Sequence, residues 1–171
     1  LLVAPFRIAT GVTVPIGGYD ADTFNASYAI GPQKRYTASL SASYGELYGG
    51  TQTAFGVGSG RLALTSHLAV EPSISINRVD LPYGKFTTQL YRTRVTYTFS
   101  PRMYAGGFIQ YNSSNSTFST NLRMRWEYSP GSELFVVYTD DENMNPLTPN
   151  RSSELLNRAV VVRINRLFRF S

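Results

Sequence analysis

Apolar and polar residues alternate with a period of two along most of this chain. From Phe118 to Tyr128 the even positions are mainly apolar or aromatic, and the odd positions are polar or charged. The segments from Thr87 to Phe99 and from Tyr36 to Tyr44 repeat the pattern. Successive side chains of a β-strand point to opposite faces, so this alternation predicts strands that each have one apolar face. Helical periodicity is almost absent, and we therefore expect an all-β fold.

Turn-forming residues divide the alternating pattern into ten predicted strands, at residues 4–14, 22–30, 35–47, 52–63, 67–79, 86–99, 102–112, 116–128, 133–140 and 156–170. Glycines weaken the pattern in 52–63, and Pro72 predicts a bulge or an interrupted ladder in 67–79. Strands in soluble domains average about 5–6 residues, whereas a strand that crosses a membrane needs about 9–11. The pattern therefore predicts an antiparallel up-and-down transmembrane β-barrel. Its ten strands form either a whole small barrel or the closing part of a larger one.

The composition excludes several other classes of protein. The 171 residues fit one domain, spanning 1–171, and carry a net charge of +5. The chain has no cysteine, which excludes disulfide frameworks and thiolate sites. It has no apolar run of about 18 residues, as a transmembrane helix would need. The chain begins at Leu1 rather than Met, which predicts a processed product or a fragment.

Aromatic residues gather near the predicted strand ends on the apolar face. We expect two levels that resemble the aromatic girdles of membrane barrels. The first comprises Tyr36, Tyr97, Phe99, Trp126, Tyr128, Phe168 and Phe170, and the second Tyr44, Tyr91, Tyr111, Phe118 and Tyr138. Turns beside the first level are short, whereas those at the other rim are longer and acidic, as in outer-membrane proteins. The alternative is a soluble β-sandwich with solvated arginines.

The polar face is rich in arginine. Six arginines are predicted to line a lumen: Arg92, Arg94, Arg102, Arg123, Arg125 and Arg163. By the same alternation, Arg7, Arg35 and Arg169 also fall on the polar face of their strands. Only Glu71, Glu127 and Glu133 oppose them on this face. A basic lumen attracts anions and selects solutes by charge. In a narrow barrel, the same arginines would instead pair with acidic and hydroxyl groups and fill the interior.

The C-terminal half carries a resemblance to a protein family. The pieces FTTQL at 86–90, FSPR at 99–102, QYN at 110–112, RWEYSPGSELFVVY at 125–138 and RLFRF at 166–170 resemble a group of bacterial outer-membrane proteins. In that group a carbohydrate-binding-family-9-like domain precedes a C-terminal β-barrel, and that domain is missing here. The resemblance implies a location in the bacterial outer membrane, contact with the lipid bilayer and lipopolysaccharide, and an anionic or glycan solute. It also implies that the outer-membrane assembly machinery reads Phe168 and Phe170 as a signal, although Ser171 follows them.

Candidate chemistry elsewhere in the sequence is weak. The single histidine, His67, has Glu71 on the same face and could form a catalytic pair, but turn-flanking polar residues are the commoner case. The segment Asp140–Asn145 offers oxygen ligands for a divalent cation, without the spacing of a calcium loop. The arginines are spread over many strands, which argues against nucleic-acid binding.

We therefore expect no enzymatic activity, no cofactor and no metal. The favoured function is an outer-membrane, porin-like barrel for transport or uptake. The alternatives are a filled structural or adhesive barrel and, less favoured, a hydrolase at the outer rim.

Overall fold

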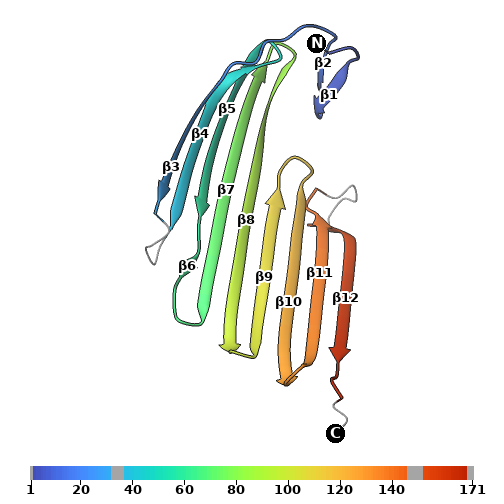
Figure 1. Cartoon of the computed structure of the whole chain (residues 1–171). Helices are drawn as coiled ribbons and strands as arrows, with labels where there is room; N and C mark the ends of the chain where they lie inside the picture. Colours follow the sequence, from blue (N-terminus) through green and yellow to red (C-terminus); the bar gives the residue numbers. More distant parts are fainter. Residues whose placement is uncertain (1, 32–36, 146–151, 169–171) are drawn as a thin grey trace.

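The computed structural model describes residues 2–31, 37–145 and 152–168, and all of the regular structure in these ranges is β (Figure 1). A single antiparallel sheet of ten strands dominates the molecule. Along its main path the strands are β3 (Thr23–Ile30), β4 (Ala38–Leu47), β5 (Gly50–Ser59), β7 (Leu68–Leu81), β8 (Gly84–Ser100), β9 (Met103–Asn112), β10 (Thr117–Ser129), β11 (Ser132–Asn143) and β12 (Glu154–Asn165). The all-β, antiparallel prediction is confirmed.

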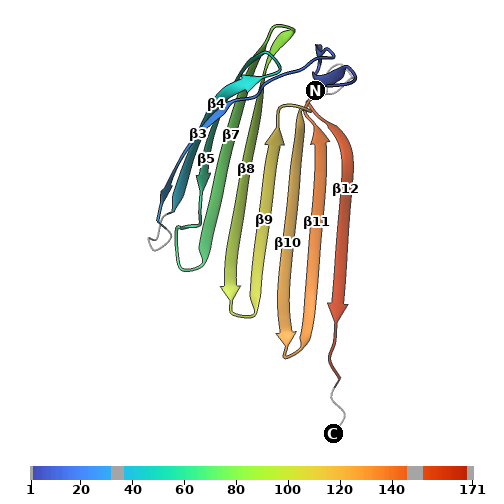
Figure 2. The same cartoon turned by 45° about the horizontal axis from the view of Figure 1, so that its top comes forward.

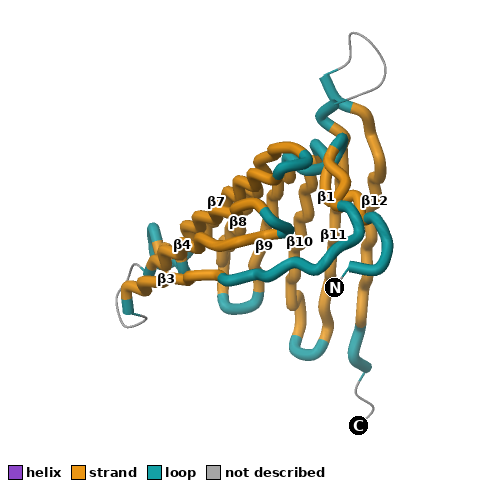
Figure 3. Tube along the Cα trace, turned by 90° about the horizontal axis from the view of Figure 1, so that it is seen from above, coloured by secondary structure: helices purple, strands orange, loops and turns teal. Residues whose placement is uncertain are grey.

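The sheet is open at both edges. In the described ranges β3 pairs only with β4, and β12 pairs only with β11. Seen along the strands, the sheet is an arc with β3 and β12 at opposite ends (Figure 3). The strands are also staggered, and the upper ends of β9–β12 lie lower than the upper ends of β7 and β8 in both side views (Figures 1 and 2). We call the end with the β7–β8 turn the upper end.

The ladder beside β7 is interrupted near Pro72, as the sequence predicts. The partner strand is split into β5 and the short β6 (Leu62–Ala63). Gly58 pairs with Ser73 and Leu62 with Val70, so four steps along one strand face three along the other. This extra residue is a β-bulge. Proline has no N–H to donate to a ladder, and it is accommodated in sheets at such irregularities.

Residues 4–14 differ from the prediction of one long strand, which was wrong. They form a separate hairpin of β1 (Phe6–Ala9) and β2 (Val12–Val14). Its two-residue turn ends in Gly11, whose φ of 78° is readily adopted only by glycine. The hairpin packs on the upper end of the sheet, where Val12, Val14, Val79 and Leu81 form the buried core cluster.

The ladder register defines two faces of the sheet. Directly paired residues of neighbouring strands share a face, and residues two apart on one strand share it too. One face carries Arg92, Arg94, Arg123, Arg125 and Arg163, and we call it the arginine face. The opposite face carries Tyr91, Tyr97, Leu122 and Trp126, and we call it the aromatic face. The hairpin core lies on the arginine face. Its residue Val79 is an even number of positions from Glu71 on β7 and so points to the same side, and Glu71 pairs directly with Arg94.

Candidate functional site on the arginine face

The register brings arginines from three strands onto one surface. Arg94 pairs with Phe108, and Phe108 pairs with Asn121. Two residues lower on β8, Thr96 pairs with Gly106, and Gly106 pairs with Arg123. Lower still, Arg125 lies opposite Phe135, which is itself opposite Arg163 of β12.

The other arginines predicted on this face lie elsewhere. Arg102 is in the β8–β9 turn, where its carbonyl accepts a hydrogen bond from the backbone N–H of Glu127. Arg7 belongs to β1, whereas Arg35 and Arg169 fall outside the described residues. The arginines of β8, β10 and β12 therefore make up the arginine face of the sheet, on which the candidate site is sought.

Acidic residues pair with some of these arginines. Arg94 Nη1 lies 3.8 Å from Glu71 Oε2, and Arg125 forms an ion pair with Glu133. Arg92 Nη2 donates a hydrogen bond of 3.4 Å to the Ser73 hydroxyl. Within the described ranges Arg123 forms no ion pair, and neither do Arg92 and Arg163.

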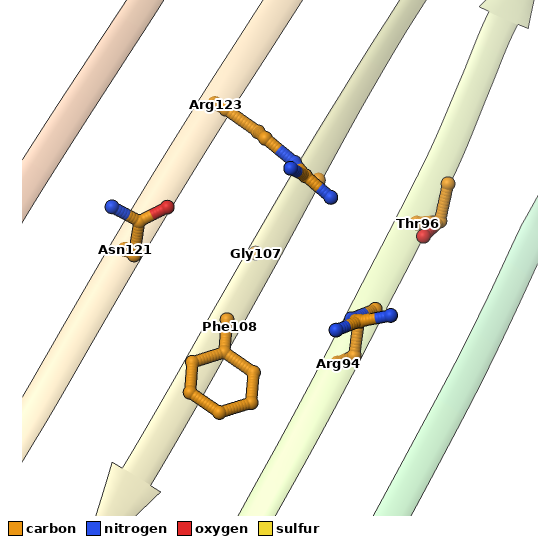
Figure 4. A pocket seen from close by; sticks show the side chains of 7 residues that line it. Arg94, Thr96, Gly107, Phe108, Asn121 and Arg123 are labelled. Atoms are coloured by element: carbon orange, nitrogen blue, oxygen red, sulfur yellow. The ribbon is translucent and has the colours of Figure 1, made fainter.

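A hollow of about 220 Å³ lies on the arginine face over β9 (Figure 4). We call it the Arg94–Arg123 pocket. Its lining residues come from three strands: Arg94 and Thr96 from β8, Gly106, Gly107 and Phe108 from β9, and Asn121 and Arg123 from β10. Figure 4 shows the Arg123 side chain extending from β10 across β9, with Arg94 on the far side of β9, on β8. Two cations, one amide and one aromatic ring thus border a single small hollow.

Gly106 keeps the floor of this pocket low. A Cβ atom added there would lie 3.4 Å from Arg123 Nε and 3.6 Å from Arg123 Cγ. The Arg123 side chain therefore lies directly over the glycine backbone. A larger side chain at this position would displace the guanidinium group.

The hairpin covers the same face at the upper end of the sheet. Val14 is fully buried, and Val79 is 1% exposed beneath it. The connection from β2 to β3 runs along the hollow side of the arc (Figure 3). On this connection, burial and a hydrogen bond with Tyr83 raise the pKa of the Tyr19 hydroxyl. A second hollow lies between β1, the upper part of β8 and the β9–β10 turn, with Arg7 on its wall.

The predicted aromatic residues form two rows on the aromatic face. The lower row contains Tyr97 and Phe99, with ring centroids 4.7 Å apart, and Trp126 and Tyr128, 6.0 Å apart. Phe168 lies beyond the end of β12, and Tyr36 and Phe170 fall outside the described residues. The upper row contains Tyr44, Tyr91, Tyr111, Phe118 and Tyr138, and Tyr91 stacks on Tyr111 at 6.3 Å.

Charged residues avoid the band between these rows. Within the strands, the charged residues of the aromatic face all lie above the upper row: Glu46, Arg78, Asp80, Lys85, Asp140, Glu142 and Arg158. Five of them form ion pairs: Lys85 with Asp80 at 2.7 Å, and Arg158 with Asp140 at 2.8 Å and with Glu142 at 3.5 Å. The band itself exposes large apolar side chains, such as Leu122 and Ile74.

The candidate catalytic and divalent-cation residues are engaged in other contacts. His67 Nδ1 lies 3.0 Å from the Thr98 carbonyl oxygen, whereas Glu71 contacts Arg94. In the segment Asp140–Asn145, Asp140 and Glu142 pair with Arg158. The described ranges contain no group of three or more His, Asp or Glu side chains that could hold a metal ion.

Sequence parity alone does not reveal the convergence of Arg94 and Arg123. The two residues are far apart in the chain, and only the β8–β9–β10 register brings them to one pocket. The pair Gly106-Gly107 within a strand is the local signal that was available, because such glycines often mark a close approach.

The comparisons with known proteins identify no relative: no protein-family model, no curated protein and no solved structure matches the chain. Nor does the described part contain a helix long and apolar enough to cross a membrane. The class defined by the fold is thus an all-β protein built on one large antiparallel sheet. The resemblance to outer-membrane proteins with a carbohydrate-binding-family-9-like domain stays a prediction.

Proposed function

We propose that this chain forms the wall of a β-barrel in the bacterial outer membrane, with the aromatic face toward lipid and the arginine face toward a lumen that attracts anionic solutes. The observation that carries the proposal is the charge-free band between the two aromatic rows. A soluble sheet would bury such a band under a second layer, whereas none of the strands in the described ranges covers the aromatic face of this sheet. Hydrocarbon is the medium that favours a band of this composition.

The slope of the upper row supports this orientation. Directly paired residues lead from Tyr44 on β4 across β5 and β7 to Thr87 on β8. Tyr91 lies four residues below Thr87 on β8. Directly paired residues likewise lead from Tyr91 across β9 and β10 to Glu142 on β11. Tyr138 lies four residues below Glu142 on β11. The row thus falls eight residues over the six steps from β4 to β11. At about 3.4 Å per residue and about 4.8 Å per strand, this is a slope of about 43°.

A row of interfacial aromatics lies parallel to the membrane plane. The slope of the row relative to the ladder therefore equals the tilt of the strands from the membrane normal. Strands of outer-membrane barrels tilt by about 35–45°, which matches the slope. On β10, eight residues separate Phe118 from Trp126, and at this tilt they span about 20 Å along the normal. The apolar band of known barrels is about 25 Å tall.

A lipid environment requires that both edges of the sheet be paired. An unpaired strand edge in hydrocarbon leaves N–H and C=O groups without partners. In the proposed barrel, β3 and β12 therefore each pair with another strand. We do not propose an enzymatic role, because His67 and Glu71 have separate partners on the described sheet.

One observation favours a filled barrel as the second candidate. The arginine face also carries large apolar side chains, namely Tyr104, Phe108, Phe135, Val137 and Val161. A wide aqueous channel does not require these residues, whereas a barrel filled by its own side chains does. Such a barrel would serve a structural or adhesive role without conductance.

Tryptophan quenching in lipid tests which face meets the bilayer. The chain has a single tryptophan, Trp126, at the lower row. In full-length protein reconstituted into vesicles, lipids brominated near the headgroup should quench it more than lipids brominated deep in the acyl chain. In a Trp126→Phe background, Leu122→Trp should be quenched best by the deep probe, and Asn121→Trp by neither. Equal quenching at positions 121 and 122 would contradict the orientation. Single-channel recordings of the same preparation then separate the pore from the filled barrel.

A further inference from the structure

We propose that the Arg94–Arg123 pocket is a discrete binding site for a small organic oxyanion, a carboxylate or a phosphate ester with an apolar group attached. The proposal deepens the proposed function, since it assigns a ligand class to the arginine face. It rests on the geometry of the pocket and would hold for a conducting or a filled barrel.

The two guanidinium groups converge on one hollow. Arg94 and Arg123 are two strands and two residues apart in the register, which is about 12 Å between backbones. The Arg123 side chain crosses the glycine floor and shortens this gap (Figure 4). Two like charges facing the same hollow repel each other, and a bound oxyanion would remove that repulsion while accepting charge-assisted hydrogen bonds.

The existing acidic partner leaves the site net positive. Glu71 lies on the β7 side of Arg94, away from β9, and its distance of 3.8 Å is longer than a close charge-assisted hydrogen bond. The Glu71 side chain is also about one third exposed. Arg123 has no acidic partner within the described ranges, so one full positive charge is available to a ligand.

Asn121 and Phe108 make the pocket selective for more than charge. Asn121 Nδ2 donates a hydrogen bond of 2.9 Å to the Thr139 hydroxyl, which fixes the amide at the edge of the hollow. The Phe108 ring is half-buried and lies beside Asn121 and Arg94. It offers an apolar surface next to the cations, on which a flat organic group can stack. The volume of about 220 Å³ matches a small ligand.

Benzoate is the probe that tests the site, with acetate and inorganic phosphate as comparisons. Binding is measured by calorimetry on the full-length protein refolded in detergent, where no conductance is needed. We expect benzoate to bind more tightly than acetate. Arg123→Gln should weaken benzoate binding about tenfold or more, which is the usual effect of losing one charge-assisted hydrogen bond. Gly106→Leu should weaken it similarly without changing the charge, because the leucine displaces Arg123.

Arg92→Gln is the matched control. It removes the same charge from the same face, but Arg92 bonds to Ser73 and does not line the pocket. It should change benzoate affinity by no more than about threefold, the effect of a distant screened charge. Native heat-modifiable mobility shows that each variant is folded.

Two results would overturn the site. If Arg92→Gln and Arg123→Gln weaken binding equally, the arginines act as a diffuse field. If benzoate binds no better than acetate, Phe108 contributes nothing. If the protein does not conduct but binds benzoate, the pore is rejected and the binding site is retained.

Discussion

Arginine placed at position 122 should destabilise the protein far more than arginine at position 121. Leu122 lies four residues from Phe118 and four from Trp126, so it marks the midplane of the proposed lipid-facing band, and it is 45% exposed there. Arginine at the midplane of a membrane barrel costs about 2–4 kcal/mol. Asn121→Arg faces the opposite side and loses the hydrogen bond to Thr139, at a cost of about 1 kcal/mol.

Denaturant titration of the full-length protein in lipid vesicles measures both values. Trp126 fluorescence reports unfolding, because it is the single tryptophan in the chain. Leu122→Ala is the control that separates loss of the leucine contacts from the cost of the charge. Equal free energies of unfolding for Leu122→Arg and Asn121→Arg would refute the assignment of the two faces.

Three further predictions concern other parts of the chain. Replacing Arg92, Arg94, Arg123 and Arg125 by glutamine should shift the reversal potential of a conducting barrel toward cations, most at low salt, where screening is weak; cation preference in the unmodified protein would argue against a basic lumen. Deleting Phe168–Ser171 should abolish outer-membrane insertion in cells while refolding into detergent micelles persists, and heat-modifiable gel mobility compares the two; normal insertion in cells would show that this ending is not the assembly signal. Val14→Asp puts an unpaired carboxylate into the buried hairpin core, at a cost of about 3–5 kcal/mol; it should expose the β1–β2 turn to protease and leave β8–β11 protected from hydrogen exchange, and an unchanged cleavage pattern would contradict the packing.

The sequence predicted the long strands well, because alternation with a period of two has one structural explanation when it runs for ten residues or more. It failed at residues 4–14 for a definite reason. The two-residue turn pairs Ala9 with Val12 and alone would have broken the alternation, but the irregularity between Arg7 and Ala9 restores it, so Phe6 pairs with Val14 and the apolar residues alternate across the turn much as they would in one strand. Only the glycine marked the reversal, and isolated glycines also occur inside other strands of this chain.

The site was less predictable than the strands. Parity assigned Arg94 and Arg123 to one face, but the register between β8, β9 and β10 decides which arginines meet. Register depends on turn geometry and on packing between strands that are distant in sequence. The sequence left open whether the ten strands close on themselves or belong to a larger barrel, since alternation describes each strand and carries no information about closure.

The slope of the upper aromatic row has a consequence for the diameter of the proposed barrel. Diameter depends on strand tilt and strand number together, and in that barrel the slope gives the tilt. Strand number is then the one free variable. Barrels of about eight strands are filled by side chains, whereas barrels of about 16–18 leave an aqueous channel. The strands of the closed assembly can be counted by electron microscopy in lipid nanodiscs. That count would distinguish a barrel filled by its own side chains from a pore without any measurement of conductance.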